Sequence, residues 1–217
     1  MAVNAIDIGQ IVVNATVFNF KNLQSSVVNE NKLFNAVEQL FTLLDQRKIN
    51  AVLVEGIALL QYVEGRNTED IDFIIAVDAL QKLPEISLQS QDDFFAQGNL
   101  DELKIDFLLT RNRLFQYVQQ HHTVVQEFVG HSIQCTTVEG LLLLKLYALP
   151  SLYRQGNFDR VALYAGDIMM LLRRCGADVQ PLFAVLAKYL PASDLVSLRE
   201  ITTEIQQRIR RFGQDFS

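Results

Sequence analysis

The chain has 217 residues, of which 49% are hydrophobic and 20% are charged, and its formal net charge is −6. This is the composition of an ordinary globular protein with room for a sizeable core. A membrane-spanning segment is not expected, because the most apolar run, Leu141–Leu149, is too short and carries Lys145. A disulfide scaffold is not expected either, because Cys135 and Cys175 lie far apart and form no C-x-x-C motif.

The cellular setting follows from the same features. The cysteine pattern favours a reducing compartment, and the N-terminus has no basic stretch followed by an apolar one, so no signal peptide is expected. We therefore expect a cytoplasmic protein without a membrane partner. Residues 1–110 hold seven Lys/Arg and 16 Asp/Glu, whereas residues 111–217 hold 12 and nine. The basic excess could steer a polyanion to the C-terminal half, but solvated helix faces explain it more simply.

Hydrophobic periodicity along the chain predicts a mixture of strands and helices. The first helix is expected over residues 31–48, where apolar side chains recur at spacings of three and four. The later elements are expected, in chain order, at 51–54 (strand), 57–63 (helix), 70–77 (strand), 102–109 (strand), 111–120 (helix), 123–129 and 131–135 (a hairpin), 136–149 (a helix interrupted by Pro150), and 157–174, 179–190 and 194–212 (helices). Residues 84–100 are expected to form a loop with an irregular strand.

The fold class that follows is α+β, with a small mixed β-sheet and flanking helices followed by a helical C-terminal part. The sheet domain is expected at residues 29–136, and the helical part, packed on it, at 137–217. Residues 1–28 are rich in Asn and Val and form an N-terminal segment for which no element is predicted.

Two carboxylates separated by one residue, Asp70 and Asp72, carry the strongest functional signal. On a strand, residues i and i+2 share a face, so both side chains would project to the same side. Adjacent carboxylates repel each other unless a cation lies between them, and a hard divalent ion is the usual one. The strand expected at 102–109 alternates polar and apolar residues and could set Asp106 beside them as a third carboxylate. The alternative is that Asp70 and Asp72 cap a strand end and that Asp106 faces solvent.

A strand, a glycine turn, a short helix, a strand with Asp-x-Asp and a later strand with one Asp resemble the DNA-polymerase-β-like nucleotidyltransferase superfamily. The resemblance is closest to its minimal nucleotidyltransferases, a branch that includes the AbiEii-type abortive-infection toxins. That branch typically has Gly-Gly-x-Ala-Leu and then Arg-x-Thr-x-Asp-x-Asp, which match residues 55–59 (Glu-Gly-Ile-Ala-Leu) and 66–72 (Arg-Asn-Thr-Glu-Asp-Ile-Asp) of this chain. The resemblance is good over residues 50–110 and weaker over residues 136–175.

This resemblance implies an enzyme that moves a nucleoside monophosphate from an NTP to a hydroxyl group of RNA, a protein or a small molecule. Mg²⁺ or Mn²⁺ would be the cofactor, with Asp70, Asp72 and Asp106 as metal ligands and catalytic residues. Asp106 would also help to deprotonate the attacking hydroxyl. A toxin role, with an antitoxin-like protein partner, is implied by the resemblance alone.

Four further residues are implied as nucleotide-binding ones: Gly56, Arg66, Thr68 and Lys145. Gly56 would let the backbone approach a phosphate at a helix start. Arg66 would pair with a phosphate or with a nearby carboxylate, and Thr68 would order the loop. A purely structural ion pair is the alternative for Arg66, and an ordinary strand-to-helix turn is the alternative for Gly56.

Lys145 interrupts an apolar helix, where an unpaired buried charge would be costly. By resemblance it would contact the triphosphate, and the alternative is a side chain that reaches the surface. Asp159 and Asp167 in the next helix are expected on the helix surface or in ion pairs.

Glu55 departs from the family pattern, which has glycine there, and its carboxylate would repel a triphosphate. The alternative function is therefore a nucleotidyltransferase-fold binding or regulatory module with weak or lost catalysis. Two other classes that use Asp-x-Asp fit less well. Phe73 stands where haloacid-dehalogenase-type phosphatases have a small or hydroxyl residue, and a metal-dependent glycosyltransferase would need a longer nucleotide-sugar domain.

Overall fold

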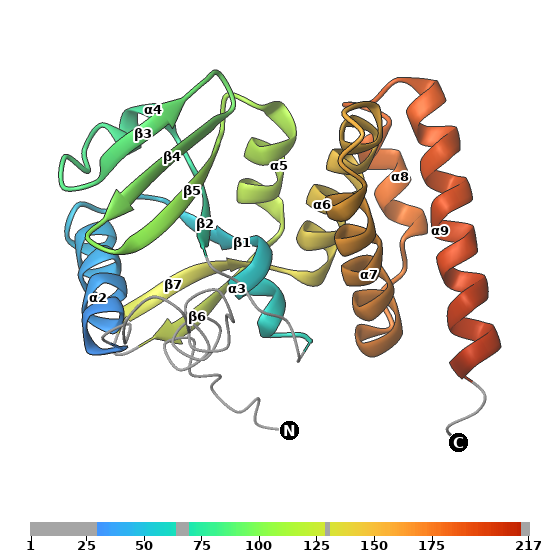
Figure 1. The fold of residues 1–217 in the computed structure, drawn as a ribbon, viewed down its shortest axis with the longest axis horizontal. Coiled ribbons are helices and arrows are strands. Elements are labelled where there is room, and N and C mark those ends of the chain that lie inside the picture. Colours follow the sequence, from blue (N-terminus) through green and yellow to red (C-terminus); the bar gives the residue numbers. More distant parts are fainter. Residues whose placement is uncertain (1–29, 64–69, 129–130, 214–217) are drawn as a thin grey trace. The chain divides into compact units, whose positions relative to one another are not determined.

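The structure, a computed structural model, describes residues 30–63, 70–128 and 131–213. The chain divides into two compact units, Met1–Thr137 and Val138–Ser217. Within the described residues, the first unit contains a sheet with helices and the second contains helices alone (Figure 1). The α+β class expected from the sequence is therefore confirmed.

The sheet of the first unit, over the part of the chain that the structure describes, has seven strands in the order β3-β4-β5-β2-β1-β7-β6. The pairs β2–β5 and β1–β7 are parallel and the others are antiparallel, so the sheet is mixed. The strands are β1 (Val52–Val54), β2 (Ile71–Ile75), β3 (Ser87–Gln91), β4 (Phe95–Leu100), β5 (Leu103–Leu109), β6 (Thr123–Phe128) and β7 (His131–Thr136).

Two helices of the first unit cover opposite faces of this sheet. These two are α2 (Glu30–Gln46) and α5 (Arg113–His121), and the described part of the unit also has the short helices α3 (Glu55–Leu60) and α4 (Val77–Leu80). Phe41 of α2 meets the ring of Phe73 edge-on, with centroids 6.1 Å apart. Phe115 of α5 meets Phe95 in the same way at 5.6 Å. Phe95 and Ile74 both pair with Leu108, so their side chains share one face of the sheet. Phe73 is the neighbour of Ile74 in β2, and its side chain therefore points to the opposite face.

The helix expected over residues 31–48 is confirmed by α2, and the hairpin expected at 123–135 is confirmed by β6 and β7. The periodic apolar residues of α2 supply its contact with the sheet, which is why an amphipathic segment folds here. Those whose side chains the structure describes are all buried: Val37, Leu40, Phe41 and Leu44.

The loop predicted for residues 84–100 is wrong, because β3 and β4 form an antiparallel hairpin. The irregular strand predicted with it is present, since the register of β3 shifts between Leu88 and Ser90. The buried positions of β4 are Ala96, Gly98 and Leu100, and alanine and glycine contribute little to an alternating hydrophobic pattern. The five residues of β3 are all exposed, so this edge strand has no buried face and hence no alternating hydrophobic pattern in the sequence.

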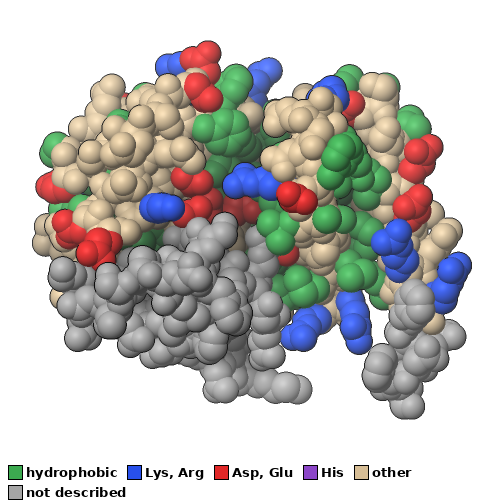
Figure 2. All heavy atoms as spheres, in the orientation of Figure 1, with side chains coloured by type: hydrophobic (Ala, Val, Ile, Leu, Met, Phe, Trp, Pro, Cys, Tyr) green, Lys and Arg blue, Asp and Glu red, His purple; other side chains and the backbone are tan. Residues whose placement is uncertain are grey.

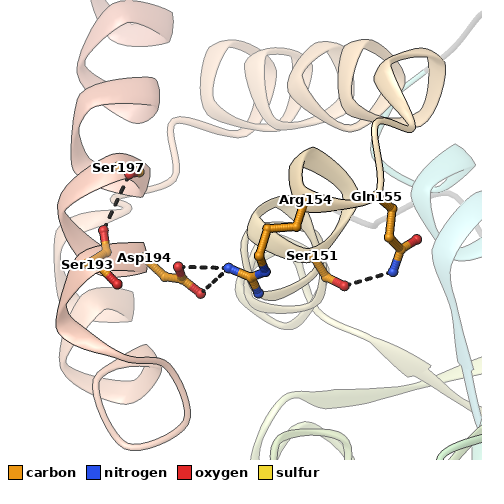
Figure 3. Close-up of polar contacts among 6 residues, drawn as sticks. All are labelled: Ser151, Arg154, Gln155, Ser193, Asp194 and Ser197. Carbon is orange, nitrogen blue, oxygen red and sulfur yellow. Dashed lines mark hydrogen bonds and ion pairs between the residues drawn. The ribbon is translucent and has the colours of Figure 1, made fainter.

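The second unit consists, within its described residues, of α6 (Val138–Arg154), α7 (Phe158–Cys175), α8 (Gln180–Leu186) and α9 (Ala192–Gly213). Helix α6 packs against the other three. Arg154 at the end of α6 places one guanidinium nitrogen, Nη1, 2.9 and 3.0 Å from the two carboxylate oxygens of Asp194 in the first turn of α9 (Figure 3). Among the described residues no helix is both long and apolar enough to cross a bilayer.

The expected interruption of this helix at Pro150 is also wrong, because α6 continues through Pro150 to Arg154. Proline cannot donate a hydrogen bond to the carbonyl four residues earlier, and it usually kinks or ends a helix. Here Leu149 and Pro150 are both buried. Burial of this turn offsets the missing bond.

Gly98 lies where β3 approaches β4 closely. A Cβ atom there would be 2.7 Å from Cγ2 of Ile86 and 3.1 Å from the carbonyl oxygen of Ser87. We expect Gly98→Ala to lower the free energy of unfolding by about 1–3 kcal/mol, because overpacking forces the backbone to move. Urea unfolding followed by circular dichroism measures this change.

Gly166 in α7 provides the matched control, because nothing lies within 4 Å of the Cβ that alanine would add. Gly166→Ala should raise the free energy of unfolding by about 0.5–1 kcal/mol, since alanine loses less backbone entropy in a helix. A Gly98→Ala protein as stable as the Gly166→Ala protein would contradict the close approach of β3 to β4.

Candidate active site

Two of the predicted metal ligands, Asp72 and Asp106, are register partners on the parallel strands β2 and β5. Register partners point to the same face of a sheet, and neighbouring strands lie about 4.8 Å apart, so the two carboxylates stand side by side. Both residues are half-buried. Figure 2 shows acidic side chains exposed over these two strands. We name Asp72 and Asp106 the carboxylate pair.

The carboxylate pair lies on the face of the sheet that α5 contacts. Ile74 lies two residues beyond Asp72 and Leu108 two residues beyond Asp106, so the apolar and acidic side chains share this face. Helix α5 packs on β2 and β5. This face of the two strands therefore changes from charged at the amino end, where Lys104 precedes Asp106 on β5, to apolar at the carboxyl end.

Asp70, the third predicted ligand, immediately precedes β2. Its Oδ1 atom is shielded from solvent. Among the described residues, no three His, Cys, Asp or Glu side chains are grouped closely enough to hold a metal ion together. Mg²⁺ in nucleotide sites is commonly held by one or two carboxylates together with substrate phosphates, so the donor chemistry of the carboxylate pair fits this ion. Asp70 as a further ligand stays a prediction.

The glycine turn of the family pattern lies next to Asp72. Because β1 runs antiparallel to β2, Val54 at the end of β1 is the register partner of Asp72, and α3 begins at the next residue, Glu55. Gly56 follows in the first turn of α3 and is buried. A contact of Gly56 with phosphate stays a prediction.

Glu55 adopts a left-handed backbone conformation with φ of 54°. This conformation costs a residue with a Cβ atom roughly 1–2 kcal/mol, whereas glycine adopts it readily. The position at which the family pattern has glycine is thus one where the backbone itself favours glycine. The departure at Glu55 is therefore one of conformation as well as charge.

Two substitutions at Glu55 separate its backbone strain from its charge. Glu55→Gly should raise the free energy of unfolding by about 1 kcal/mol, because glycine carries no steric penalty at this φ. Glu55→Ala removes the same carboxylate but keeps the strain, so it should not stabilise the protein. Equal stability of the two variants in urea unfolding would contradict the strain.

The same two variants test the charge. If the Glu55 carboxylate repels phosphates, both should bind a non-hydrolysable NTP with Mg²⁺ more tightly than the wild type, and a tenfold gain corresponds to about 1.4 kcal/mol. Isothermal titration measures the affinity. Weaker binding by both variants would show instead that the carboxylate contributes to the site.

Arg66, Thr68 and Lys145 are the remaining residues predicted to bind nucleotide, and no contact given for the described residues joins any of them to the carboxylate pair. Arg66 and Thr68 lie outside the described residues. Lys145 is fully buried within the second unit, with Nζ 2.9 Å from Oδ2 of Asp167 and 4.3 Å from the centre of the Tyr164 ring. Its expected alternative, a side chain that reaches the surface, is wrong, and a contact with triphosphate stays a prediction.

The acids of α7 occupy different environments. Asp167 is 1% exposed and pairs with Lys145, which is one of the two roles expected for it. Asp159 is exposed in the first turn of α7, which is the other expected role. A carboxylate near a helix N-terminus interacts favourably with the helix dipole.

Sequence reasoning missed Gln97, which lies in the segment expected to be a loop. Gln97 is the register partner of Asp106 on β4, and its Nε2 donates a hydrogen bond of 3.0 Å to Oδ1 of that carboxylate. The hydroxyl of Ser90 on β3 donates to Oε1 of Gln97 at 3.4 Å. A polar row formed by Asp72, Asp106, Gln97 and Ser90 thus crosses the four adjacent strands β2, β5, β4 and β3.

Both cysteine thiols have raised pKa values. Burial on β7 raises the pKa of the Cys135 thiol to about 11. Partial burial at the end of α7 likewise raises the pKa of the Cys175 thiol. Since the thiolate is the reactive form, the buried Cys135 side chain is a poor nucleophile at neutral pH.

Comparison with known proteins finds likeness in structure alone: no family model and no curated protein sequence matches the chain. The chain is similar to an antigenic nucleotidyltransferase-like protein from Paracoccidioides brasiliensis, with 17% identity and a TM-score of 0.49 over 79% of this chain and 93% of that one. It is also similar to ANT(2″)-Ia in complex with adenylyl-2″-tobramycin, with 11% identity and a TM-score of 0.49 over 80% and 97% of the two chains. A solution structure of the antibiotic-resistance factor ANT(2″)-Ia gives 10% identity and a TM-score of 0.48 over 83% and 96%. Each TM-score is below 0.5, so the function proposed below depends on the chain's own residues.

Proposed function

We propose that this chain is a metal-dependent nucleotidyltransferase that moves a nucleoside monophosphate from an NTP to a hydroxyl group and releases pyrophosphate. The observation that carries the proposal is the carboxylate pair, Asp72 and Asp106, aligned on neighbouring parallel strands beside the start of α3. The pair would hold Mg²⁺ or Mn²⁺, with Asp70 as a further ligand. A bound divalent ion would neutralise the triphosphate oxygens and align them with the attacking hydroxyl.

The reaction forms a bond between the acceptor oxygen and the α-phosphorus and breaks the bond from that phosphorus to the oxygen that bridges the α- and β-phosphates. Asp106 would accept the proton of the attacking hydroxyl, and pyrophosphate would leave with the bridging oxygen. Gly56 would let the backbone at the start of α3 approach a phosphate, because it carries no side chain there.

Label transfer tests this reaction directly. The protein is incubated with Mg²⁺ or Mn²⁺, with each of four NTPs labelled at the α-phosphate, and with total RNA, protein or small-molecule fractions of a cell lysate. We expect label to appear in one acceptor fraction, with an equal amount of pyrophosphate released, only when the metal is present. Failure of all four NTPs to transfer label or release pyrophosphate would contradict the proposal.

The second candidate function is a binding or regulatory module that binds NTP but does not transfer it. The observation that favours it is Glu55, whose carboxylate and strained backbone occupy the position where the family pattern has glycine. This module would bind NTP with Mg²⁺ in a thermal-shift assay but would release no pyrophosphate with any acceptor fraction.

The toxin role and the antitoxin-like partner, which rest on the family resemblance, belong to the same proposal. A toxin that acts by nucleotidyl transfer would arrest the growth of a bacterial host that expresses it. The Asp72→Asn variant, expressed at the same level, should permit growth. Equal arrest by both proteins would separate any toxicity from nucleotidyl transfer.

A further inference from the structure

We propose that Gln97 is a positioning residue for Asp106 and that it thereby raises the affinity of the carboxylate pair for a divalent cation. The inference rests on the proposed function and adds to it a residue on β4 that lies in none of the family motifs. Gln97 acts through Asp106, not on the substrate.

The orientation of the Gln97 amide is set by Asp106. A carboxylate can only accept hydrogen bonds, so the nitrogen of the amide must face Asp106, as the 3.0 Å contact from Nε2 to Oδ1 has it. The amide oxygen then faces β3, where the Ser90 hydroxyl donates to it at 3.4 Å. The Ser90 hydroxyl, which can donate or accept, is compatible with the amide orientation that Asp106 requires.

The strand order explains why this contact matters for a cation. Gln97 and Asp72 lie on opposite sides of Asp106, because β5 runs between β4 and β2. Repulsion between the two carboxylates pushes Asp106 towards β4. There the amide of Gln97 donates a hydrogen bond to Oδ1 of Asp106. The bond occupies Oδ1 and fixes the rotation of the carboxylate, which leaves Oδ2 for a cation shared with Asp72.

Burial argues against a purely structural role for the Ser90–Gln97 end of this row. Ser90 and Gln97 are both exposed, and β3 exposes all five of its residues. A hydrogen bond between neutral exposed side chains contributes little to folding, because water replaces it in the unfolded chain. Hydrogen-bond partners of metal-binding carboxylates, in contrast, change metal affinity about 10–100-fold when they are removed.

The test is Mn²⁺ binding by the full chain without nucleotide, measured from the electron paramagnetic resonance signal of the unbound ion. Gln97→Met keeps the length of the side chain but removes the amide, and we expect its Mn²⁺ dissociation constant to rise about 10–100-fold. Ser90→Ala should raise it by a smaller factor, because the Gln97 amide remains. The melting temperature of both variants without metal should stay at the wild-type value.

Gln91→Met is the matched control. Gln91 is an exposed glutamine on β3, and it pairs with Ala96, whose side chain points to the opposite face from that of its neighbour Gln97. This variant should bind Mn²⁺ as the wild type does. If Gln97→Met does not fold, as circular dichroism would show, the Ser90→Ala result decides.

The outcomes separate the inference from the proposed function. If the wild type binds Mn²⁺ and Gln97→Met binds it equally well, the positioning role is wrong and the carboxylate pair stands. If the wild type binds no Mn²⁺, with or without an NTP, the proposed function fails, and the positioning role fails with it. Equal weakening by Gln97→Met and Gln91→Met would also overturn the inference, because the effect would then not belong to Gln97.

Discussion

Asp72→Asn should abolish the rise in melting temperature that Mg²⁺ or Mn²⁺ gives the wild-type protein, because a ligand stabilises the fold only where it binds the folded state. Nucleotidyl transfer should fall about 100-fold or more, which corresponds to the several kcal/mol that a bound cation contributes to such a transition state. Without metal the variant should be as stable as the wild type or more so. The substitution removes repulsion between like charges on directly opposed residues, Asp72 and Asp106.

Asp45→Asn is the control for this prediction. Asp45 is an exposed residue in the last turn of α2, so its substitution makes the same change of net charge away from the carboxylate pair. It should leave the metal response and the rate of transfer unchanged. A full metal response in Asp72→Asn would exclude Asp72 as a ligand, and equal losses in both variants would trace the effect to net charge.

The largest stability change is expected at the buried ion pair of the second unit. Lys145 and Asp167 are 0% and 1% exposed, and their charged atoms lie 2.9 Å apart. Replacing one partner leaves the other charge buried without it, so Asp167→Asn or Lys145→Met should lower the free energy of unfolding by about 3–5 kcal/mol. Urea unfolding monitored by circular dichroism at 222 nm follows this helical unit. Fluorescence would not serve as well, because the chain has no tryptophan.

The double variant Lys145→Met with Asp167→Leu is the control for this pair. It removes both charges and keeps apolar volume, so it should recover most of the stability that either single substitution loses. It also separates the two roles of Lys145. If the folded double variant binds an NTP as the wild type does, Lys145 has no contact with triphosphate. If it folds but loses affinity, the predicted phosphate contact is supported.

The strands that carry the carboxylate pair could be predicted because they have strong local patterns. β5 alternates polar and apolar residues, and the segment that becomes β2 places Asp70 and Asp72 two residues apart before an apolar run. Periodicity of this kind predicts a strand and the face of each side chain. It does not predict which strands become neighbours, and the alignment of Asp72 with Asp106 is a property of the sheet.

β3 and β4 could not be predicted from local patterns. Alanine and glycine occupy two of the three buried positions of β4, and the five residues of β3 bury none of their side chains. What holds these strands is the hydrogen bonding of β3 to β4 and of β4 to β5, together with the close approach that Gly98 permits. The contact of Gln97 with Asp106 could not be predicted for the same reason, because only the completed sheet brings the two residues together.

The sequence did indicate that Glu55 departs from the family pattern, but it indicated only the added negative charge and not the backbone conformation. Its left-handed backbone is set by the turn from β1 into α3, a feature that a single sequence does not reveal. The path of α6 through Pro150 is a similar case. Burial of that turn outweighs the local preference of proline to end a helix.

The central claim is that the carboxylate pair holds a divalent cation that in turn binds an NTP. Isothermal titration with a non-hydrolysable NTP, with Mg²⁺ and again with EDTA, tests it most directly in the wild type and in the double variant Asp72→Asn with Asp106→Asn. We expect the wild type to bind the nucleotide only with Mg²⁺, and the double variant to bind it in neither condition. Nucleotide binding that persists unchanged in EDTA, or that survives the loss of both carboxylates, would contradict the claim.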